Sequence, residues 1–482
     1  MSTSGEVLAT EPPRWKRRVL LALVIFVVGV TVALWVTTQW MGAEGRSQLD
    51  RAIAAIEADD PRWRWEELLE DRPNPPRAEN VYPLLESVGK LLVPWDLQDL
   101  EISPRRGLLD DLPTQALLDP ERQAKLTAAL AKQKAALALA PGLRAYPRGW
   151  APLQLHPTVI GTPVPHCDDV SRVGLLLELD VEQLLQQNRP NEAADHIVAM
   201  LRCGDLLRDD PLPICQMFRM RMRYVVRQRI DRLLGLTQPS DMVCDLLRKE
   251  IAAQRRENPL LPALRGARAG VHALFLNLRS GAVSMTEFLE TINIQPSGLE
   301  AYLGIKAGLY HLRLEQDHAS ALRWLDRACG IARLPVHEQP DAWKKYQRDH
   351  VDFARESRKR WRNLLTIQLV PDVAVLTDHS LSDNAHLACL ETALALEQYR
   401  RRHGHWPARL EALQPELLPE IPRDPYTAKP LLYRIEADGC VVYTTGQDEV
   451  DDGGAKLSRH GEPGTDLGVR LWNPPQRRLP AR

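Results

Sequence analysis

The feature that most constrains this chain is an apolar run near its N-terminus, VLLALVIFVVGVTVALWV, which extends from Val19 to Val36. This run contains no charged side chain, and as a helix rising about 1.5 Å per residue it would span about 27 Å, close to the thickness of a bilayer core. Thr37 and Thr38 supply the remaining length. A helix buried in a globular core would normally carry a polar stripe, which this run lacks. The sequence therefore predicts a transmembrane anchor over residues 19–38.

The residues flanking this run predict its orientation. The segment RWKRR, residues 14–18, carries four positive charges before the run, and Trp35 and Trp40 lie at its far end. The positive-inside rule then places residues 1–18 in the cytoplasm and the chain after Met41 outside it. A cleaved signal peptide is the alternative, but its apolar core is usually about 7 to 15 residues long, and QWMGAEG is a poor cleavage site. We expect a single-pass protein of the cytoplasmic (inner) membrane, with the lipid bilayer as one partner and the bulk of the chain extracytoplasmic.

Charge and cysteine content exclude several classes of protein. The chain has 62 Lys and Arg against 63 Asp and Glu, so no overall field would attract nucleic acid, and we expect no nucleic-acid partner. The 7 cysteines include no C-x-x-C pair, so their spacing defines neither a disulfide framework nor a zinc ribbon. We predict that they are mainly small buried apolar residues, although one pair would be able to oxidise in a suitable compartment.

Hydrophobic periodicity predicts a mainly α-helical protein. Residues 39–110 indicate a juxtamembrane helix, with Leu49, Ile53 and Ile56 on one face, followed by a proline-rich link. Trp63 and Trp65 in this region are expected to pack against the body. Residues 111–380 contain successive helical segments that end at Pro or Gly, which is typical of an irregular α-helical body built of antiparallel hairpins.

The pattern changes in residues 381–482, where a small α+β domain with a short antiparallel sheet is predicted. The segment DNAHLACLETALALEQYRRRHG, from Asp383, indicates a helix that stops at Gly404. PLLYRI and CVVYTT are strand-like runs joined through Asp438-Gly439, a favourable hairpin turn, and GTDLGVRLWNPP offers a third strand.

This C-terminal region resembles the globular domain of the major pseudopilins of type II secretion. The segments LALEQYRRRHGHWPARLEAL, IPRDPY, LLYRI, VVYTTGQDEVDDGG and TDLGVRLW follow one another in the order of that family. The resemblance implies a long helix, a small antiparallel sheet, an Asp/Gly-rich loop that binds calcium and a connection to secretion. The chain lacks the pseudopilin processing signal joined directly to that helix. Its whole layout also resembles uncharacterised single-pass membrane proteins of planctomycetes, which implies no activity.

The loop GQDEVDDGG, residues 446–454, supports a structural calcium site. Calcium takes about six to eight oxygen ligands, and glycines allow the backbone to fold tightly around the ion. Asp448, Asp451, Asp452 and Asp466 are the predicted ligands, although their spacing differs from that of an EF-hand. The alternative is a solvated turn in which the aspartates accept hydrogen bonds from local backbone amides.

No known catalytic motif is present, since H-E-x-x-H, G-x-S-x-G, phosphate-loop and G-x-G-x-x-G patterns are all missing from the sequence. HCDD, residues 166–169, contains metal-ligating types, but neighbours on an extended chain point to opposite sides, so we expect a poor ligand set. The segment SRH, Ser458 to His460, lacks a third member of a triad.

The densest basic stretch of the chain is RMRMRYVVRQRIDR, residues 219–232. Its arginines indicate a solvated helix face or internal salt bridges, with lipid head groups as a further alternative.

These observations favour a membrane-anchored extracytoplasmic interaction or scaffold protein that binds an unidentified envelope protein. The alternative is an extracytoplasmic hydrolase whose site assembles in the helical body from residues distant in the sequence. An accessible cleft with convergent titratable groups of perturbed pKa would favour the enzyme, and a helical groove without such a cluster would favour the binding protein.

Overall fold

The computed structural model describes residues 14–96, 100, 112–291, 313–359, 362–370, 373–454, 457 and 465–480. Of the regions predicted from the sequence, residues 1–13 of the cytoplasmic N-terminus and residues 97–99 and 101–111 near the end of the proline-rich link lie outside the described residues.

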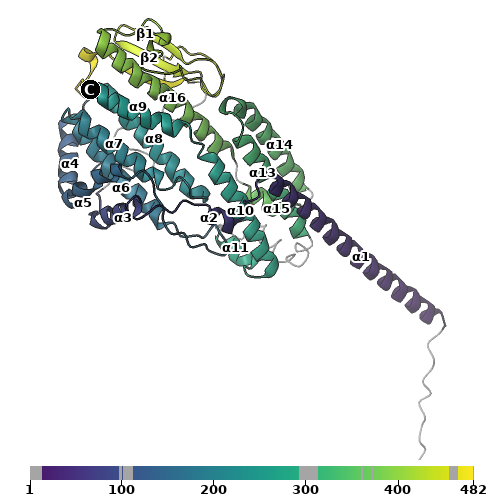
Figure 1. Cartoon of the computed structure of the whole chain (residues 1–482). Helices are drawn as coiled ribbons and strands as arrows, with labels where there is room; N and C mark the ends of the chain where they lie inside the picture. The colour runs from purple at the N-terminus through teal and green to yellow at the C-terminus, as the bar shows by residue number, and fades with distance from the viewer. Residues whose placement is uncertain are drawn as a thin grey trace, which may run out of the picture.

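The protein is mainly helical, as predicted. It begins with α1 (Arg14–Asp59), a helix of 46 residues that projects from the body at the end opposite to the C-terminal sheet (Figure 1). The apolar half of α1 is exposed, with Phe26 at 69% and Ile25 at 63%. Among the described residues, this is the one helix long and apolar enough to cross a membrane, and it fits either a signal anchor or a signal sequence.

The C-terminal part of α1 belongs to the folded body. Leu49, Ala52 and Ile56 are buried against Ala319 and Leu322 of α13 (Leu314–Ala332), in a small cluster that also holds the buried Trp63. These are the positions that the helical periodicity predicted, with Ile53 partly buried beside them. The juxtamembrane segment is therefore continuous with the apolar helix and is also part of the core.

An ion-pair network lies at the C-terminal end of α1. Asp60 follows the last residue of the helix and lies 2.7 Å from Arg265 and 3.3 Å from Arg333, with Arg268 as a third partner. Burial by itself would raise the pKa of Asp60, but Arg265 and Arg268 outweigh it and lower the pKa. Because Arg268 is wholly buried, this network fixes α1 to α10 (Leu260–Ser280).

The body is built from helices that start at prolines. Pro165, Pro190 and Pro213 occupy the first positions of three successive long helices, where the missing backbone donor has no intrahelical partner to lose. The helices not yet given are α2 (Trp65–Glu70), α3 (Tyr82–Leu91), α4 (Pro120–Ala131), α5 (Lys134–Leu139), α6 (Pro165–Gln186), α7 (Pro190–Asp205), α8 (Pro213–Leu236), α9 (Asp241–Arg255), α11 (Met285–Thr291), α14 (Gln339–Lys359), α15 (Leu364–Leu369) and α16 (Val373–His403).

The C-terminal region forms the predicted small sheet. Strands β1 (Leu432–Glu436), β2 (Gly439–Thr444) and β3 (Leu467–Trp472) pair antiparallel in the order β1-β2-β3. The first hairpin turn is Ala437-Asp438, one residue before the predicted Asp438-Gly439, because Gly439 already pairs with Glu436. A side chain at position 439 would collide with the carbonyl of Leu471, since a Cβ there would lie 1.9 Å from that oxygen.

Helix α16 joins this sheet to the body. It starts ten residues before the predicted Asp383 and ends before Gly404, whose φ of +80° gives the expected left-handed stop. Leu387, Leu390 and Leu394 of α16 belong to the same hydrophobic cluster as the core of α6, α7 and α8 and as Val442 and Val469 of the sheet. The sheet has little core of its own, so its packing depends on the helical body.

The predictions for cysteine and tryptophan are confirmed. All seven cysteines are buried and free, and Trp63 and Trp65 are buried to 2% exposure or less.

Candidate functional site

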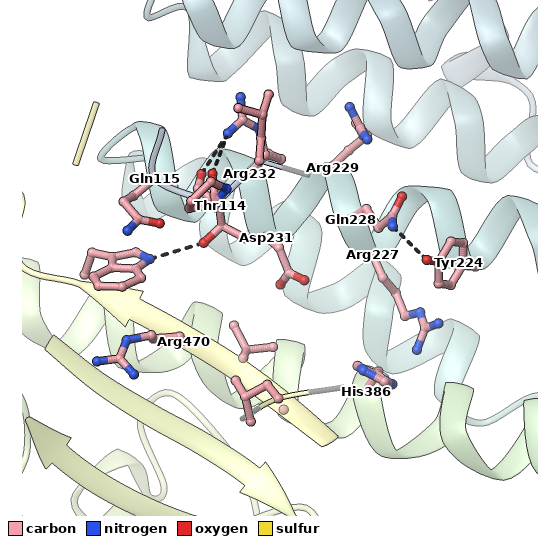
Figure 2. A pocket seen from close by; sticks show the side chains of 16 residues that line it. Thr114, Gln115, Tyr224, Arg227, Gln228, Arg229, Asp231, Arg232, His386 and Arg470 are labelled. Atoms are coloured by element: carbon pink, nitrogen blue, oxygen red, sulfur yellow. Dashed lines mark hydrogen bonds between the residues drawn. The ribbon is translucent and has the colours of Figure 1, made fainter. Parts of the chain in front are cut away.

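A pocket lies where helix α8 meets strand β3, helix α16 and the segment of residues 112–115. Its volume is about 300 Å³, and arginine side chains from α8 and β3 contribute much of its wall (Figure 2). These side chains are Arg227, Arg229, Arg232 and Arg470.

Helix α8 supplies three of the arginines because most of its basic stretch faces inward, with Arg221 as an exposed exception. Arg219, Arg223, Arg227, Arg229 and Arg232 are all less than 9% exposed, so the hypothesis of a solvated face is wrong and these side chains are unavailable to lipid head groups. The alternative hypothesis of internal salt bridges is confirmed. The ion pairs of this stretch include Arg229 with Glu178 at 3.4 Å, Arg232 with Glu182, and Arg223 with Asp383 at 2.8 Å.

Arg227 lines the pocket and, like the neighbouring Arg223, has two buried nitrogens without a hydrogen-bond partner among the described residues. It is 7% exposed and its Nε lies 3.4 Å from Asp383, a carboxylate that Arg223 approaches more closely. Within the described part of the chain, neither Nε nor Nη1 of Arg227 has a hydrogen-bond partner. Burial lowers the pKa of Arg227, although the negative charges of Asp383 and Asp231 oppose this shift. A buried guanidinium with free N–H groups favours an anionic ligand.

The rest of the pocket wall is held by hydrogen bonds. Arg232 donates to the carbonyls of Pro113, Thr114 and Ala116, and so fixes the segment that borders the pocket. Arg470 lies 3.0 Å from Asp438, and its guanidinium stacks 4.7 Å from the ring of Trp472.

Opposite α8, the pocket is bordered by α16. His386 Nδ1 donates to the Ser382 carbonyl over 2.9 Å, and Figure 2 shows the imidazole near the guanidinium end of Arg227. The cavity is therefore bordered by fixed groups, and Arg227 lies in its wall.

The four predicted calcium ligands lie around the end of strand β2. Asp451 Oδ1 accepts from Tyr443 Oη at 3.1 Å and from Gly453 N at 2.8 Å, and Asp448 Oδ1 accepts from Val450 N at 3.1 Å. Hydrogen bonds from local backbone amides to aspartates are what the solvated-turn alternative predicted. Among the residues that the structure describes, these carboxylates do not form a group of three with oxygens within 4.8 Å of one another. Calcium binding by the loop stays a prediction.

Asp466 is the buried member of this set. Its side chain accepts from Gly454 N at 2.6 Å and from Asp452 N at 3.4 Å, which places it beneath the loop, as the sequence predicted. Burial raises the pKa of Asp466, and the charges of Asp451 and Asp452 add to the rise although the two backbone amides oppose it. The loop therefore concentrates negative charge that a cation would neutralise.

A second cluster of titratable groups lies inside the helical body. The HCDD segment is the first turn of α6 and not an extended chain, so the prediction that its neighbours diverge is wrong. His166 Nε2 lies 2.9 Å from Asp210 Oδ2, and Cys167 Sγ lies 3.4 Å from Cys215 Sγ. Burial lowers the pKa of His166, but Asp210 and Cys167 outweigh it and raise the pKa to about 9; the contact with Cys215 lowers the pKa of Cys167.

An enzyme site was expected to combine convergent titratable groups of perturbed pKa with an accessible cleft, and this cluster has only the first of these. Its groups converge and have perturbed pKa values, but His166, Cys167, Asp210 and Cys215 are all 1% exposed or less. A substrate cannot reach them without opening of the helical core. The other residues considered as a nucleophile and its base, Ser458 and His460, lie outside the described residues.

Sequence reasoning missed both Arg227 as a ligand group and Asp210 as a partner of His166. The four-residue spacing of Arg223 and Arg227 indicated one helical face, but the sequence carried no signal that this face points inward. No protein family, curated protein or solved structure matches the chain. The chemistry of the two sites is therefore inferred from their geometry.

Proposed function

We propose that this protein is a membrane-anchored extracytoplasmic interaction or scaffold protein whose arginine-lined pocket binds an acidic group of an envelope partner. The observation that carries the proposal is Arg227, a buried cation in the pocket wall whose Nε and Nη1 have no hydrogen-bond partner among the described residues, although Nε lies 3.4 Å from Asp383. An anionic oxygen group that entered the pocket would satisfy these donors and gain charge-assisted hydrogen bonds.

The geometry of α1 supports the anchored part of the proposal. One unbroken helix carries the exposed apolar segment into the core, where Leu49 and Ile56 are buried and Asp60 is held by arginines. Removal of a signal sequence at its usual small-residue site would cut this helix. The continuous helix instead suits an anchor that holds the body at a fixed distance from the bilayer.

The connection to secretion and the structural calcium ion rest on the pseudopilin resemblance. What supports it is the packing of the long helix α16 against a three-stranded antiparallel sheet, with the acidic loop between β2 and β3. The hydrolase alternative has the weaker support, because the convergent His166 and Asp210 pair is enclosed in the core.

The pocket is tested by measuring anion binding to the detergent-solubilised full chain by titration calorimetry. The probes are inorganic phosphate and a short peptide with one glutamate, compared with the same peptide carrying glutamine. We expect the anionic probes to bind and the glutamine peptide not to bind. The R227Q substitution should weaken binding about 10- to 100-fold, because it removes charge-assisted hydrogen bonds.

The control variant is R355Q on α14, where the side chain is 63% exposed and forms a surface pair with Asp352. It should bind the anionic probes as the natural protein does. Absence of binding by every anionic probe, or equal affinity in R227Q and the natural protein, would exclude the pocket as the recognition site.

A further inference from the structure

Four metal-ligating side chains meet at the N-terminal ends of helices α6 and α8. His166 and Cys167 lie in the first turn of α6, Cys215 lies in the first turn of α8, and Asp210 lies in the connection between α7 and α8. The structure describes one group of at least three such side chains with ligand atoms within 4.8 Å of one another, and that group is His166, Cys167 and Cys215. Asp210 contacts the same ring nitrogen of His166 that faces Cys215, but its carboxylate lies outside that group of three.

The separations between these atoms approach those of a tetrahedral zinc site. With Zn–S bonds of about 2.3 Å and Zn–N or Zn–O bonds of about 2.0–2.1 Å, a tetrahedron has edges of about 3.8 Å between two sulfurs, 3.6 Å between S and N, and 3.3 Å between N and O. The corresponding distances are 3.4 Å for Cys167 to Cys215, 3.7 Å for Cys215 to His166, and 2.9 Å for His166 to Asp210. These three separations would have to change by about 0.4 Å or less to admit the ion, and the carboxylate of Asp210 would also have to move closer to the sulfurs.

The surroundings resemble those of a closed structural site. All four side chains are 1% exposed or less, so no position is open to solvent or substrate. The second oxygen of Asp210 lies 3.2 Å from the buried Arg72, which also donates to Ala151 O. Gln216 donates to the carbonyls of Leu207, Arg208 and Asp210, which fixes the connection that carries Asp210. Outer contacts of this kind orient the groups that bind a metal.

We propose that His166, Cys167, Asp210 and Cys215 form a structural zinc site that ties α6 to α8. The ion takes the position of the proton that His166 Nε2 shares with Asp210. Each thiol gives up its proton to solvent, and an imidazolium at His166 gives up the Nε2 proton and keeps the Nδ1 proton. Two thiolates, one carboxylate, Arg72 and a divalent zinc ion then sum to zero charge, which suits a site without solvent.

A disulfide between Cys167 and Cys215 is the competing arrangement. It would require the two sulfurs to approach to about 2.05 Å, a larger change in the sulfur–sulfur distance than the one that zinc requires. It would also leave His166 and Asp210 without a role in the cluster. The two arrangements exclude each other, because oxidised sulfurs cannot bind the ion as thiolates, and this makes them distinguishable.

The test uses the full chain, purified in detergent without chelator. Elemental analysis should find about one zinc per chain, and the C215S variant should lose it. The matched control is C203S, which changes another wholly buried cysteine in the neighbouring helix α7 and should keep the zinc. The D210N variant, with the other three ligands intact, should bind zinc about 10- to 100-fold more weakly.

Cobalt substitution gives a readout that does not depend on how well a variant folds. Cobalt added to the metal-free natural protein should produce the visible bands of a tetrahedral ion together with thiolate-to-cobalt charge transfer. Absence of these bands in the natural protein would overturn the proposal. It would also be overturned if alkylation of the unfolded, unreduced chain left Cys167 and Cys215 unmodified, since that result identifies the disulfide.

Discussion

At the scale of single residues, a buried histidine pair stands out beside the two sites. His272 of α10 and His318 of α13 are 8% and 3% exposed, and their facing nitrogens lie 3.0 Å apart. Phe275 stacks on His318 with ring centroids 4.6 Å apart, and Trp63 lies 4.8 Å from His272. Two nitrogens at this distance share one proton, so the pair cannot accept a second charge without separating.

This pair predicts a loss of stability in mild acid. Burial lowers the pKa of His272 to about 4 and that of His318 to about 2, with the positive charges of Arg64 and Arg279 adding to the shift at His272 and Glu57 opposing it. Both pKa values lie below the pKa of about 6.5 that a histidine has in the unfolded chain. The pair therefore does not reduce the free energy of unfolding above that pH, and it reduces this free energy progressively as the pH falls towards 4. At pH 5 each histidine should destabilise the fold by about 2 kcal/mol.

The measurement is thermal unfolding at pH 7.5 and pH 5 for the natural protein and for H318L, which cannot take up the proton. We expect a smaller decrease in Tm between the two pH values for H318L. H337Q, which changes a side chain 51% exposed, should behave as the natural protein does. An equal acid-induced decrease in H318L and the natural protein would show that other groups cause the sensitivity.

At the scale of elements, the loop between β2 and β3 determines whether the sheet depends on a cation. Its aspartates accept hydrogen bonds from the loop backbone, and Asp466 beneath them has a raised pKa. A cation that binds only the folded loop would stabilise it by about 2.7 kcal/mol at a concentration of 100 times Kd.

The sequence-based prediction of calcium is checked by thermal melts in calcium and in chelator. If calcium binds, a C-terminal unfolding transition should rise in calcium, and the rise should be lost when Asp451 and Asp452 are both changed to Ala. D341A, at a side chain 95% exposed on α14, is the control and should retain the rise. Identical melts in calcium and chelator would show that the loop is an acidic turn held by its own amides.

At the scale of the whole molecule, α1 determines where the body can act. The helix leaves the body at the end opposite to the sheet, so an anchored molecule would present α8, α16 and the sheet away from the bilayer (Figure 1). The arginine-lined pocket would then face partners that lie further from the membrane surface, which suits an interaction protein.

This orientation predicts the outcome of a topology experiment. Alkaline phosphatase fused to the C-terminus should be active, because it would lie outside the cytoplasm, and the intact mass of the membrane-extracted chain should include residues 1–40. Replacing the positive charges of residues 14–18 by glutamine should reduce the correctly oriented fraction. A soluble product that lacks the apolar run would identify a cleaved signal sequence instead.

The sequence by itself determined the features that depend on neighbouring residues. The uncharged run of α1, the prolines that start α6, α7 and α8, and the hairpin signal at Asp438-Gly439, one residue past the turn itself, are local signals. Helix initiation, hydrophobic periodicity and turn geometry all involve residues a few positions apart. The burial of Leu49 and Ile56 and the order of helix and strands in the C-terminal region were predictable for the same reason.

Only the tertiary structure decided which polar groups meet. His166 and Asp210 are 44 positions apart and Arg227 pairs with Asp383 across the chain, so no local spacing could place them together. The inward direction of the basic face of α8 was equally hidden, because an arginine is buried only where folding supplies Glu178, Glu182 or Asp383 as partners. Long-range packing therefore assembles both the pocket and the His/Cys cluster, whereas local periodicity fixes the elements that carry them.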